Sequence, residues 1–474
     1  MVRIAMLVRG PQVNRRSFGL RPQDERPLTL NCESLVRPAH KLLAVLGVTF
    51  GLAVTIGNTI GAGILRTPGT VAAHLPTLVP FISVWVIGGL YALLGANALA
   101  ELGTMIPRSG GQYVFVRRGL GDYAGFVVGW SDWLSTCGTT AAVSIVIGEY
   151  SVILFPELVA HQAIALLVVG LLTIIQWFGI RAAGAAQNVT SLLKVVVFAI
   201  LIAACFWVGG RNPGTASFEP DSEGSVLLAF LLALQAVIYT YEGWFAVVYF
   251  SEEVKEPARN IPRAILGGVA LVIVMYLLIN LAFLRVVPLG TIAGEKFAAE
   301  AVTQQMFGLH ANTVVRVLTI LVLLSVANAR ILMAPRVLYA MSNDGLFWRG
   351  ACEVNAGGTP DVALMISSMV AAAFIVTGTF ESVVGKLAFF FVANYTLSLI
   401  TLFVLRRREP DAARPFRAIG HPVTTGLALL ASVAFLIGAI ASDAASTIWT
   451  LALLCLSIPT YLVLHSHRTD ELSI

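Results

Sequence analysis

Twelve apolar runs dominate this sequence of 474 residues. A helix needs about 20 predominantly apolar residues to cross a hydrocarbon core about 30 Å thick, and each run is long enough to do so. With 57% hydrophobic and only 12% charged residues, the composition excludes a water-soluble fold of this size. We therefore predict an all-α polytopic membrane protein with twelve transmembrane helices. The predicted runs cover residues 42–73, 79–104, 122–150, 160–179, 187–208, 225–250, 263–287, 305–338, 361–380, 384–405, 422–441 and 446–465.

The distribution of Lys and Arg predicts the orientation of the chain, because basic residues are retained in the cytoplasm during insertion. Of the 31 Lys and Arg residues, 23 fall in the two tails and in alternate loops, and four fall in the intervening loops. We therefore expect a multi-pass protein of the cytoplasmic (inner) membrane with both termini in the cytoplasm. Residues 1–41 are expected to form a basic, largely disordered tail, and residues 466–474 a second cytoplasmic tail. The net charge of +5 is expected to orient loops and not to bind nucleic acid.

Two of the twelve runs contain residues that interrupt a helix. The first run holds three glycines and an asparagine within residues 57–63, and we predict a break at residues 61–63. The sixth run carries Glu242 and Gly243 at its centre, and we predict a second break there. Interrupted segments in corresponding positions of two halves indicate an inverted-repeat transporter with its substrate site near the bilayer midplane. Runs one and six are five apart, as expected for the first members of two five-helix repeats.

Each break would expose backbone groups that lipid cannot satisfy, so it must face protein, water or a ligand. After Gly61, the second half-helix would present free amides and the positive end of its dipole, which suit a carboxylate. The carbonyls near Thr59, with those near Tyr239 and Glu242, suit an ammonium group. A zwitterion would then be held between the two breaks. The alternative is that Gly57 and its neighbours only permit tight helix packing.

Of the ionisable residues within apolar runs, Glu242 and Lys194 are the main functional candidates, because a charge at bilayer depth is costly. Glu242 could contact a substrate amine, accept a proton or brace the break, and the alternative is a neutral carboxyl hydrogen-bonded to the freed backbone. Lys194 could titrate or hold a positive charge beside backbone carbonyls, and the alternative is a side chain that snorkels to the cytoplasmic interface. Tyr239 and Trp244 could cap a substrate or simply pack. For Arg316 and Arg330 we expect pairing or interfacial bracing instead of chemistry.

Several classes of function lack their signatures in this sequence. The chain has neither the G-x-x-x-x-G-K-[ST] pattern of ATP-driven proteins nor the H-E-x-x-H pattern of zinc proteases. All seven histidines fall in tails, loops or the ends of runs, and the five cysteines lack the paired spacing of a zinc site. We therefore expect no metal, no cofactor and no enzymatic activity.

Several motifs at consistent intervals make the chain similar to the amino acid–polyamine–organocation (APC) permeases, and most similar to bacterial relatives of L-type amino acid transporters. Residues 56–64 resemble the family's unwound substrate-carboxylate site, and residues 100–111 resemble its characteristic second-span end. The remaining motifs cover residues 241–244, 251–263, 336–345 and 414–417.

This resemblance implies the leucine-transporter fold, with two inverted repeats of five helices and two extra helices. The repeats would be residues 42–208 and 225–405, followed by helices eleven and twelve within residues 421–465. It also implies that Lys194 takes the place of a sodium ion and that Tyr239 forms the substrate lid. Ala62 stands where many members have serine, and Tyr239 where Phe or Trp is more usual. The implied substrate-binding set is Thr59, Gly61, Ala62, Gly63, Ile64, Tyr239, Glu242 and Gly243, with Lys194, Glu242 and Tyr239 in coupling or gating.

The function implied is sodium-independent secondary active transport of amino acids, by proton symport or by amino acid exchange. The expected partners are the amino acid substrate, membrane lipids and protons as a coupling ion. No accessory subunit is expected, since no cysteine in the predicted extracellular loops is available to bridge to one. A polyamine or organocation carrier and a non-transporting amino acid sensor are the alternatives.

Overall fold

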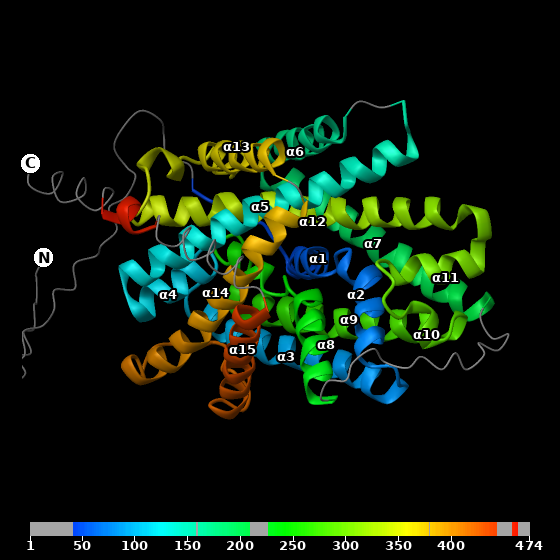
Figure 1. Ribbon diagram of the computed structural model, residues 1–474. Coiled ribbons are helices and arrows are strands. Elements are labelled where there is room, and N and C mark those ends of the chain that lie inside the picture. The colour runs from blue at the N-terminus through cyan, green and yellow to red at the C-terminus, as the bar shows by residue number, and fades with distance from the viewer. Residues whose placement is uncertain (1–40, 158–159, 209–225, 379, 443–456, 463–474) are drawn as a thin grey trace, which may run out of the picture.

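The computed structural model describes residues 41–157, 160–208, 226–378, 380–442 and 457–462, and these residues are almost entirely helical (Figure 1). Their one strand-like feature is an isolated parallel bridge between Leu46 and Val254. The longer elements are α1 (Val48–Thr59), α2 (Gly63–His74), α3 (Leu78–Met105), α5 (Asp122–Leu154), α6 (His161–Trp177), α7 (Ile180–Val208), α8 (Val226–Thr240), α9 (Pro257–Val286), α12 (Ala311–Asn343), α13 (Asp361–Thr377), α14 (Phe380–Arg408) and α15 (Val423–Ser442). The short elements are α4 (Gln112–Leu120), α10 (Leu289–Ile292), α11 (Ala298–Phe307) and the 3-10 helices η1 (Ala246–Phe250), η2 (Gly308–His310) and η3 (Arg349–Cys352).

Eleven of the twelve predicted runs coincide with helices in the described part of the chain. The first run corresponds to α1 and α2, the sixth to α8 and η1, and each of the others to one long helix. The eighth helix starts at Ala311 and not at residue 305, because Gly308 adopts a φ of 53° and separates α11 from α12. The predicted tails, apart from Lys41, and most of the twelfth run lie outside the described residues.

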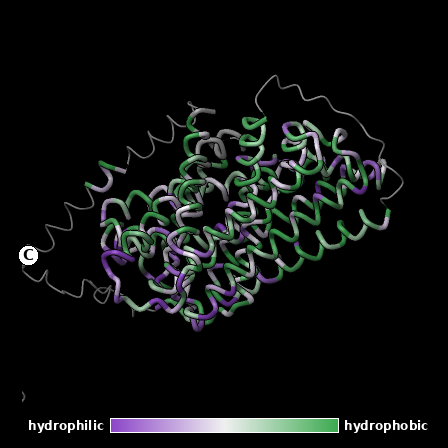
Figure 2. The backbone as a smooth tube through the Cα atoms, turned by 90° about the horizontal axis from the view of Figure 1, so that it is seen from below, coloured by the Kyte–Doolittle hydropathy of each residue, from purple (hydrophilic) through white to green (hydrophobic). Residues whose placement is uncertain are grey.

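The described helices identify the chain as a multi-pass membrane protein. Six of them are long and apolar enough to span a bilayer, and the bent pair of α1 and α2 adds a seventh candidate. Four further apolar helices are shorter, namely α6, α8, α13 and part of α15. Hydrophobic residues follow the helices along most of their length, and hydrophilic residues gather mainly toward one end (Figure 2).

Helices at equivalent positions in the two predicted five-helix repeats make equivalent contacts. A helix and its equivalent lie five predicted spans apart in the chain. In this correspondence α3 pairs with α9, α5 with α12 and α7 with α14. The contacts of α3 with α9 and of α5 with α12 map onto themselves. The contact of α7 with α12 is matched by that of α14 with α5, and the contact of α7 with α9 by that of α14 with α3. These contacts are therefore made by corresponding helices in the two halves of the chain.

Helix α1 lies in the middle of this arrangement, where α7, α9, α12 and η1 all pack against it (Figure 1). Most of its residues are buried, including the polar Thr55, Asn58 and Thr59. A helix end in this position cannot obtain hydrogen bonds from bulk water, so its partners must come from neighbouring helices.

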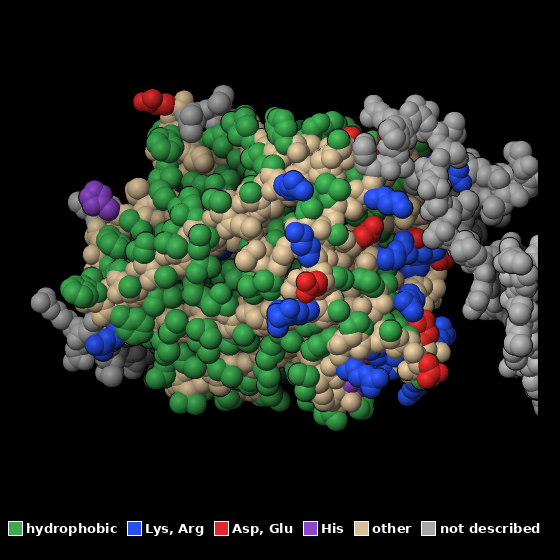
Figure 3. Space-filling model, turned by 180° about the vertical axis from the view of Figure 1, so that it is seen from behind, with side chains coloured by type: hydrophobic (Ala, Val, Ile, Leu, Met, Phe, Trp, Pro, Cys, Tyr) green, Lys and Arg blue, Asp and Glu red, His purple; other side chains and the backbone are tan. Residues whose placement is uncertain are grey.

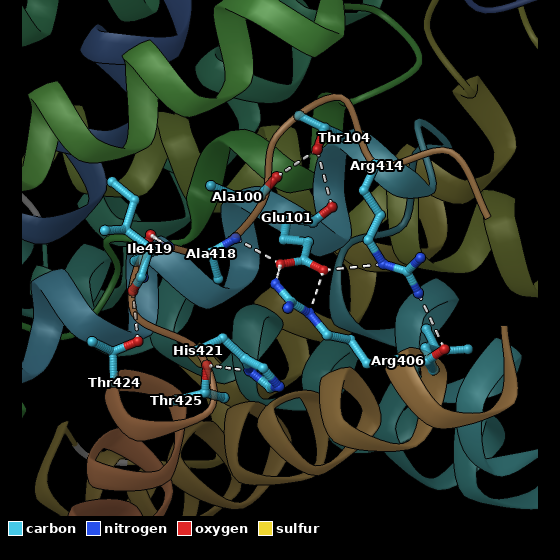
Figure 4. A network of polar contacts seen from close by, with 12 residues as sticks. Ala100, Glu101, Thr104, Arg406, Arg414, Ala418, Ile419, His421, Thr424 and Thr425 are labelled. Carbon is cyan, nitrogen blue, oxygen red and sulfur yellow. Dashed lines mark hydrogen bonds and ion pairs between the residues drawn. The ribbon is translucent and has the colours of Figure 1, made fainter. Parts of the chain in front are cut away.

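A buried carboxylate ties the end of α3 to α14 and to the loop that follows it (Figure 4). The Glu101 side chain is fully buried, and its carboxylate accepts hydrogen bonds from Arg406 at 2.9 and 2.5 Å. Its Oε1 also lies 3.2 Å from the Arg414 guanidinium, and its Oε2 accepts a 2.6 Å hydrogen bond from the Ala418 amide. This part of the second-span motif therefore has a structural role, since it fixes the loop before α15.

We expect Glu101→Ala to lower the free energy of unfolding by about 3–5 kcal/mol, because it removes the acceptor of Arg406 and of the Ala418 amide and leaves the buried Arg414 without its carboxylate partner. Thermal unfolding of the purified protein in detergent measures this effect. Glu149→Ala, which removes an exposed carboxylate from α5, is the control and should change the melting temperature little. Equal melting temperatures for the two variants would contradict the assigned role.

Candidate functional site

The first helical break lies where the glycine cluster predicts it. Helix α1 ends at Thr59, helix α2 begins at Gly63, and the two are bent by 46°. Residues 53–60 and 64–65 are buried, whereas Gly61, Ala62 and Gly63 are half-buried. These three residues of the break are therefore partly accessible.

The second break follows the end of α8 at Thr240. Turns cover residues 241–245, after which the chain continues as η1. Gly243 has a φ of 109°, and a Cβ atom at this position would lie 2.8 Å from the Asn58 backbone oxygen. Asn58 in turn donates its side-chain amide to the Gly243 carbonyl at 2.9 Å. Glycine is thus required both by the backbone conformation and by the close approach of α1.

The two breaks lie side by side on antiparallel chains. Helix α2 packs against α8, whereas α1 packs against η1. The Thr67 and Thr240 hydroxyls are 2.7 Å apart, and Thr240 is also the nearest neighbour of a Cβ built on Gly63, at 3.1 Å. The sequence predicts each break, and the structure brings the two together.

Tyr276 of α9 joins both breaks. Its hydroxyl lies 3.0 Å from the Thr59 carbonyl and 3.0 Å from the Thr240 carbonyl, so its one proton is shared between the last residues of the two broken helices. Its side chain is fully buried. Sequence analysis did not identify Tyr276, because a tyrosine in an apolar run is usually a packing residue; its place near the middle of the seventh run is the only available signal.

Lys194 of α7 caps the end of α1. The side chain is fully buried, and Nζ donates hydrogen bonds to the carbonyls of Gly57 at 2.7 Å and Ile60 at 2.6 Å. These carbonyls belong to the last turn of a helix, where intrahelical donors run out and the dipole is negative. The lysine therefore does not snorkel. Its Nζ lies beside backbone carbonyls inside the protein, where it could either titrate or hold a positive charge.

A buried polar network surrounds this cap. Ser191 donates to the Ala53 carbonyl at 2.7 Å and lies 3.1 Å from the Ser325 hydroxyl of α12. Gln187 accepts a 2.8 Å hydrogen bond from Asn328. A Cβ on Gly57 would come within 2.1 Å of the Gln187 amide nitrogen, so this glycine permits the close contact of α1 and α7. Close packing explains Gly57, as the alternative interpretation held, whereas a Cβ on Gly61 would have Val326 as its nearest neighbour, at 4.0 Å.

Glu242 pairs with Arg330 of α12. The Arg330 guanidinium donates to the Glu242 carboxylate at 2.6 Å, and the two side chains are 2% and 11% exposed. The pairing expected for Arg330 is confirmed, but its partner could not be named from the sequence. Glu242 is therefore held by a cation and not by the freed backbone.

Asp132 of α5 is a further ionisable residue in this region that was not predicted from the sequence. Its side chain is buried, and its carboxylate accepts a 2.7 Å hydrogen bond from the Tyr249 hydroxyl of η1. Both Arg330 and Glu242 act on it electrostatically. The signal was available, because a carboxylate inside an apolar run is rare enough to mark a functional region.

The remaining predicted residues divide into accessible and packed ones. Tyr239, in the last turn of α8, is 42% exposed, and its carbonyl accepts a 3.2 Å hydrogen bond from the Glu242 amide. Trp244 is buried against Tyr395 with ring centroids 5.9 Å apart, so it packs and does not cap the site. The Thr59 and Tyr239 carbonyls each accept one hydrogen bond. Because a carbonyl oxygen has two lone pairs, each can accept a second one.

The site can therefore bind a group with two opposite charges. The first turn of α2 presents the Gly63 and Ile64 amides, which have no intrahelical acceptors, at the positive end of the helix dipole. Within the described residues, no group of three or more His, Cys, Asp or Glu side chains could hold a metal ion. The polar groups that the described site offers a ligand are backbone amides, backbone carbonyls and the Arg330–Glu242 pair.

The family described as "Amino acid permease" matches residues 42–462 of this chain. The serine/threonine exchanger SteT of Bacillus subtilis (strain 168) is 26% identical over 430 residues, which cover 88% of this chain and 95% of the exchanger. The b(0,+)-type amino acid transporter 1 of Oryctolagus cuniculus is 28% identical over 382 residues, 78% of each chain. The large neutral amino acids transporter small subunit 2 of the same species is 26% identical over 391 residues, 78% of this chain and 71% of that protein.

We expect Tyr276→Phe to raise the KM for amino acid uptake roughly tenfold, because the Thr59 and Thr240 carbonyls lose a donor worth about 1–1.5 kcal/mol. Initial rates in proteoliposomes measure the effect. Tyr91→Phe is the matched control: it removes another buried hydroxyl, which bonds Ser432 in α15, and should leave KM unchanged. The same KM in both variants would contradict the role of Tyr276 at the breaks.

Proposed function

The chain belongs to the amino acid permease family, and from that premise we propose that it is a sodium-independent secondary active transporter that moves amino acids across the cytoplasmic membrane by alternating access. The observation that carries this proposal is the meeting of the two breaks. They come from predicted spans five apart and lie side by side, with Gly61 to Gly63 and Glu242 partly buried. Relatives named as amino acid transporters and as an exchanger support the same function.

The proposed architecture is a twelve-helix membrane protein with two inverted repeats of five helices, as in the leucine-transporter fold. The exchange of equivalent helix contacts supports it, as does the antiparallel arrangement of the two broken helices. We also propose that both termini are cytoplasmic. In support, Lys and Arg side chains gather at the end of the molecule formed by α4 and the end of α14, which carry the predicted cytoplasmic residues (Figure 3).

In this proposal the substrate's α-carboxylate binds the amides of Ala62, Gly63 and Ile64. The half-buried state of Gly61 to Gly63 supports this placement, because a ligand can approach the backbone closely where no side chain intervenes. The α-amino group binds the carbonyls of Thr59, Tyr239 and Glu242, and Gly243 keeps the second break close to the first. The exposed Tyr239 ring forms the lid.

Sodium independence is proposed from the position of Lys194. A sodium ion at this junction would need backbone carbonyls from the end of α1. The Lys194 ammonium group already binds those of Gly57 and Ile60, and a second cation beside it would be repelled. Transport would then be coupled by amino acid exchange or by proton symport.

Uptake by the purified chain alone, reconstituted in proteoliposomes, tests the proposal. We expect labelled amino acids to enter without a sodium gradient, and either internal amino acid or an inward proton gradient to accelerate uptake. Uptake by the chain alone would also exclude a need for an accessory subunit. Measurable binding without uptake or exchange would contradict transport and support a sensor, and competition by decarboxylated analogues would support an organocation carrier.

Gly63→Leu should abolish binding and uptake, because its side chain would fill the space in front of the α2 amides, where Thr240 lies only 3.1 Å from the added Cβ. Gly170→Leu is the control, since a Cβ on this α6 glycine meets nothing within 4 Å. Binding by scintillation proximity and uptake are both measured. Near-normal affinity in Gly63→Leu would remove the carboxylate from the first break.

A further inference from the structure

The Arg330–Glu242 pair has hydrogen-bonding groups left over, and they point to the kind of substrate that the site selects. We propose that this pair recognises amino acids whose side chain is uncharged but carries both a hydrogen-bond acceptor and a donor, above all a carboxamide. The inference rests on the transport function proposed above and deepens it by naming a substrate class.

The pair is placed where a substrate side chain would lie. The atom nearest to a Cβ built on Gly61 is the Val326 Cγ2 of α12, at 4.0 Å, and Ala62 packs against the hydrophobic cluster that contains Val326. Arg330 follows Val326 by four residues, so it lies on the same face of α12, one turn and about 6 Å further along the axis. Glu242 belongs to the second break itself. An amino acid bound between the breaks by its α-groups would therefore direct its side chain toward this pair.

Both members of the pair are incompletely satisfied. Arg330 donates through one terminal nitrogen to the Glu242 Oε2, whereas its Nε and other terminal nitrogen are buried without a hydrogen-bond partner in the described structure. The Glu242 Oε1 is likewise buried without a hydrogen-bond partner in the described structure. Phe391 of α14 covers one face of the guanidinium, with Cζ 4.9 Å from the ring centroid. The free N–H groups therefore lie along the guanidinium edge, near a free carboxylate oxygen.

The charges at this position disfavour an ionised substrate side chain. The pair is neutral as a unit, so an added carboxylate would be repelled by Glu242 and would find no unpaired positive charge at Arg330. An added ammonium or guanidinium group would be repelled by Arg330. An apolar side chain would leave the buried donors and the acceptor unpaired, which is the situation that polar binding sites reject most strongly.

A carboxamide satisfies both members at once. Its oxygen accepts from the free N–H groups of Arg330, and its NH2 group donates to the Glu242 Oε1. A hydroxyl side chain offers the same two functions through a single oxygen, so it fits the class less completely. The distance from the breaks to the pair then decides between the asparagine and glutamine lengths.

Two sets of nearly isosteric amino acids test the selection: glutamine, glutamate and methionine, and asparagine, aspartate and leucine. Initial uptake rates of each labelled amino acid are compared in the same proteoliposomes. In at least one set, kcat/KM for the amide should be higher than kcat/KM for the acidic and for the apolar amino acid. The difference from the apolar amino acid should be on the order of 100-fold. Uptake of methionine or leucine at or above the amide rate would overturn the inference while leaving transport standing, and absence of all uptake would overturn both.

Single-charge variants provide the sharper test, because a purely structural pair would not produce their result. Glu242→Gln leaves an uncompensated Arg330 and should shift the preference toward glutamate or aspartate at least tenfold relative to the amide. Arg330→Gln leaves the Glu242 carboxylate without its cation and should shift the substrate preference toward lysine. Equal losses for all substrates in both variants would overturn the inference. If Arg330→Gln fails to fold, Glu242→Gln decides alone, since lost stability cannot raise the relative rate of an acidic substrate.

Arg316→Gln serves as the control, because it removes an arginine from the same helix near its opposite end. It should leave every substrate ratio unchanged. If Arg316→Gln shifted the substrate preference as much as the site variants do, the substrate ratios would depend on the overall charge of the protein. That result would overturn the inference.

Discussion

Every backbone group inside a bilayer must find a hydrogen-bond partner within the protein or its ligand, and the structure is organised around two places where a helix cannot supply one. At the end of α1, the carbonyls of Gly57, Ile60 and Thr59 are satisfied by Lys194 and Tyr276. Tyr276 also serves the end of α8. These partners leave free the amides at the start of α2, and we propose that these amides bind the substrate's carboxylate. In this proposal the residues that stabilise the breaks also determine which backbone groups a substrate can reach.

Charges inside the bundle follow a related rule. Arg336 of α12 makes two hydrogen bonds to Glu253, at 3.1 and 3.0 Å, and both side chains are fully buried. Glu253 also contributes the carbonyl that accepts from the Leu46 amide, so this ion pair is tied to the chain just before α1. Such pairs contribute little net stability but fix the relative positions of helices, because removing one partner leaves a buried charge. The Arg330–Glu242 pair differs in having donors and an acceptor to spare.

Most of the helical architecture could be predicted from the sequence, because apolar runs of about 20 residues have few alternatives in a membrane. The two breaks could also be predicted, because glycines and a carboxylate at bilayer depth are unfavourable in a continuous transmembrane helix. The side-chain partners that residues find on other helices could not be predicted. Nothing in the sequence sets the rotation of α12 relative to the second break, so Arg330 could be expected to pair but not with Glu242. Tyr276 was missed because a tyrosine signals nothing until the carbonyls it meets are known.

The central claim is that the two breaks together hold the α-amino and α-carboxyl groups of an amino acid. The most direct measurement is a cryo-EM map of the protein in nanodiscs with its best-transported amino acid at saturating concentration. We expect density between the breaks, with the carboxylate about 3 Å from the Gly63 and Ile64 amides and the amino group facing the Thr59 and Tyr239 carbonyls. An amino acid bound elsewhere in the molecule, with the breaks unoccupied, would contradict the claim.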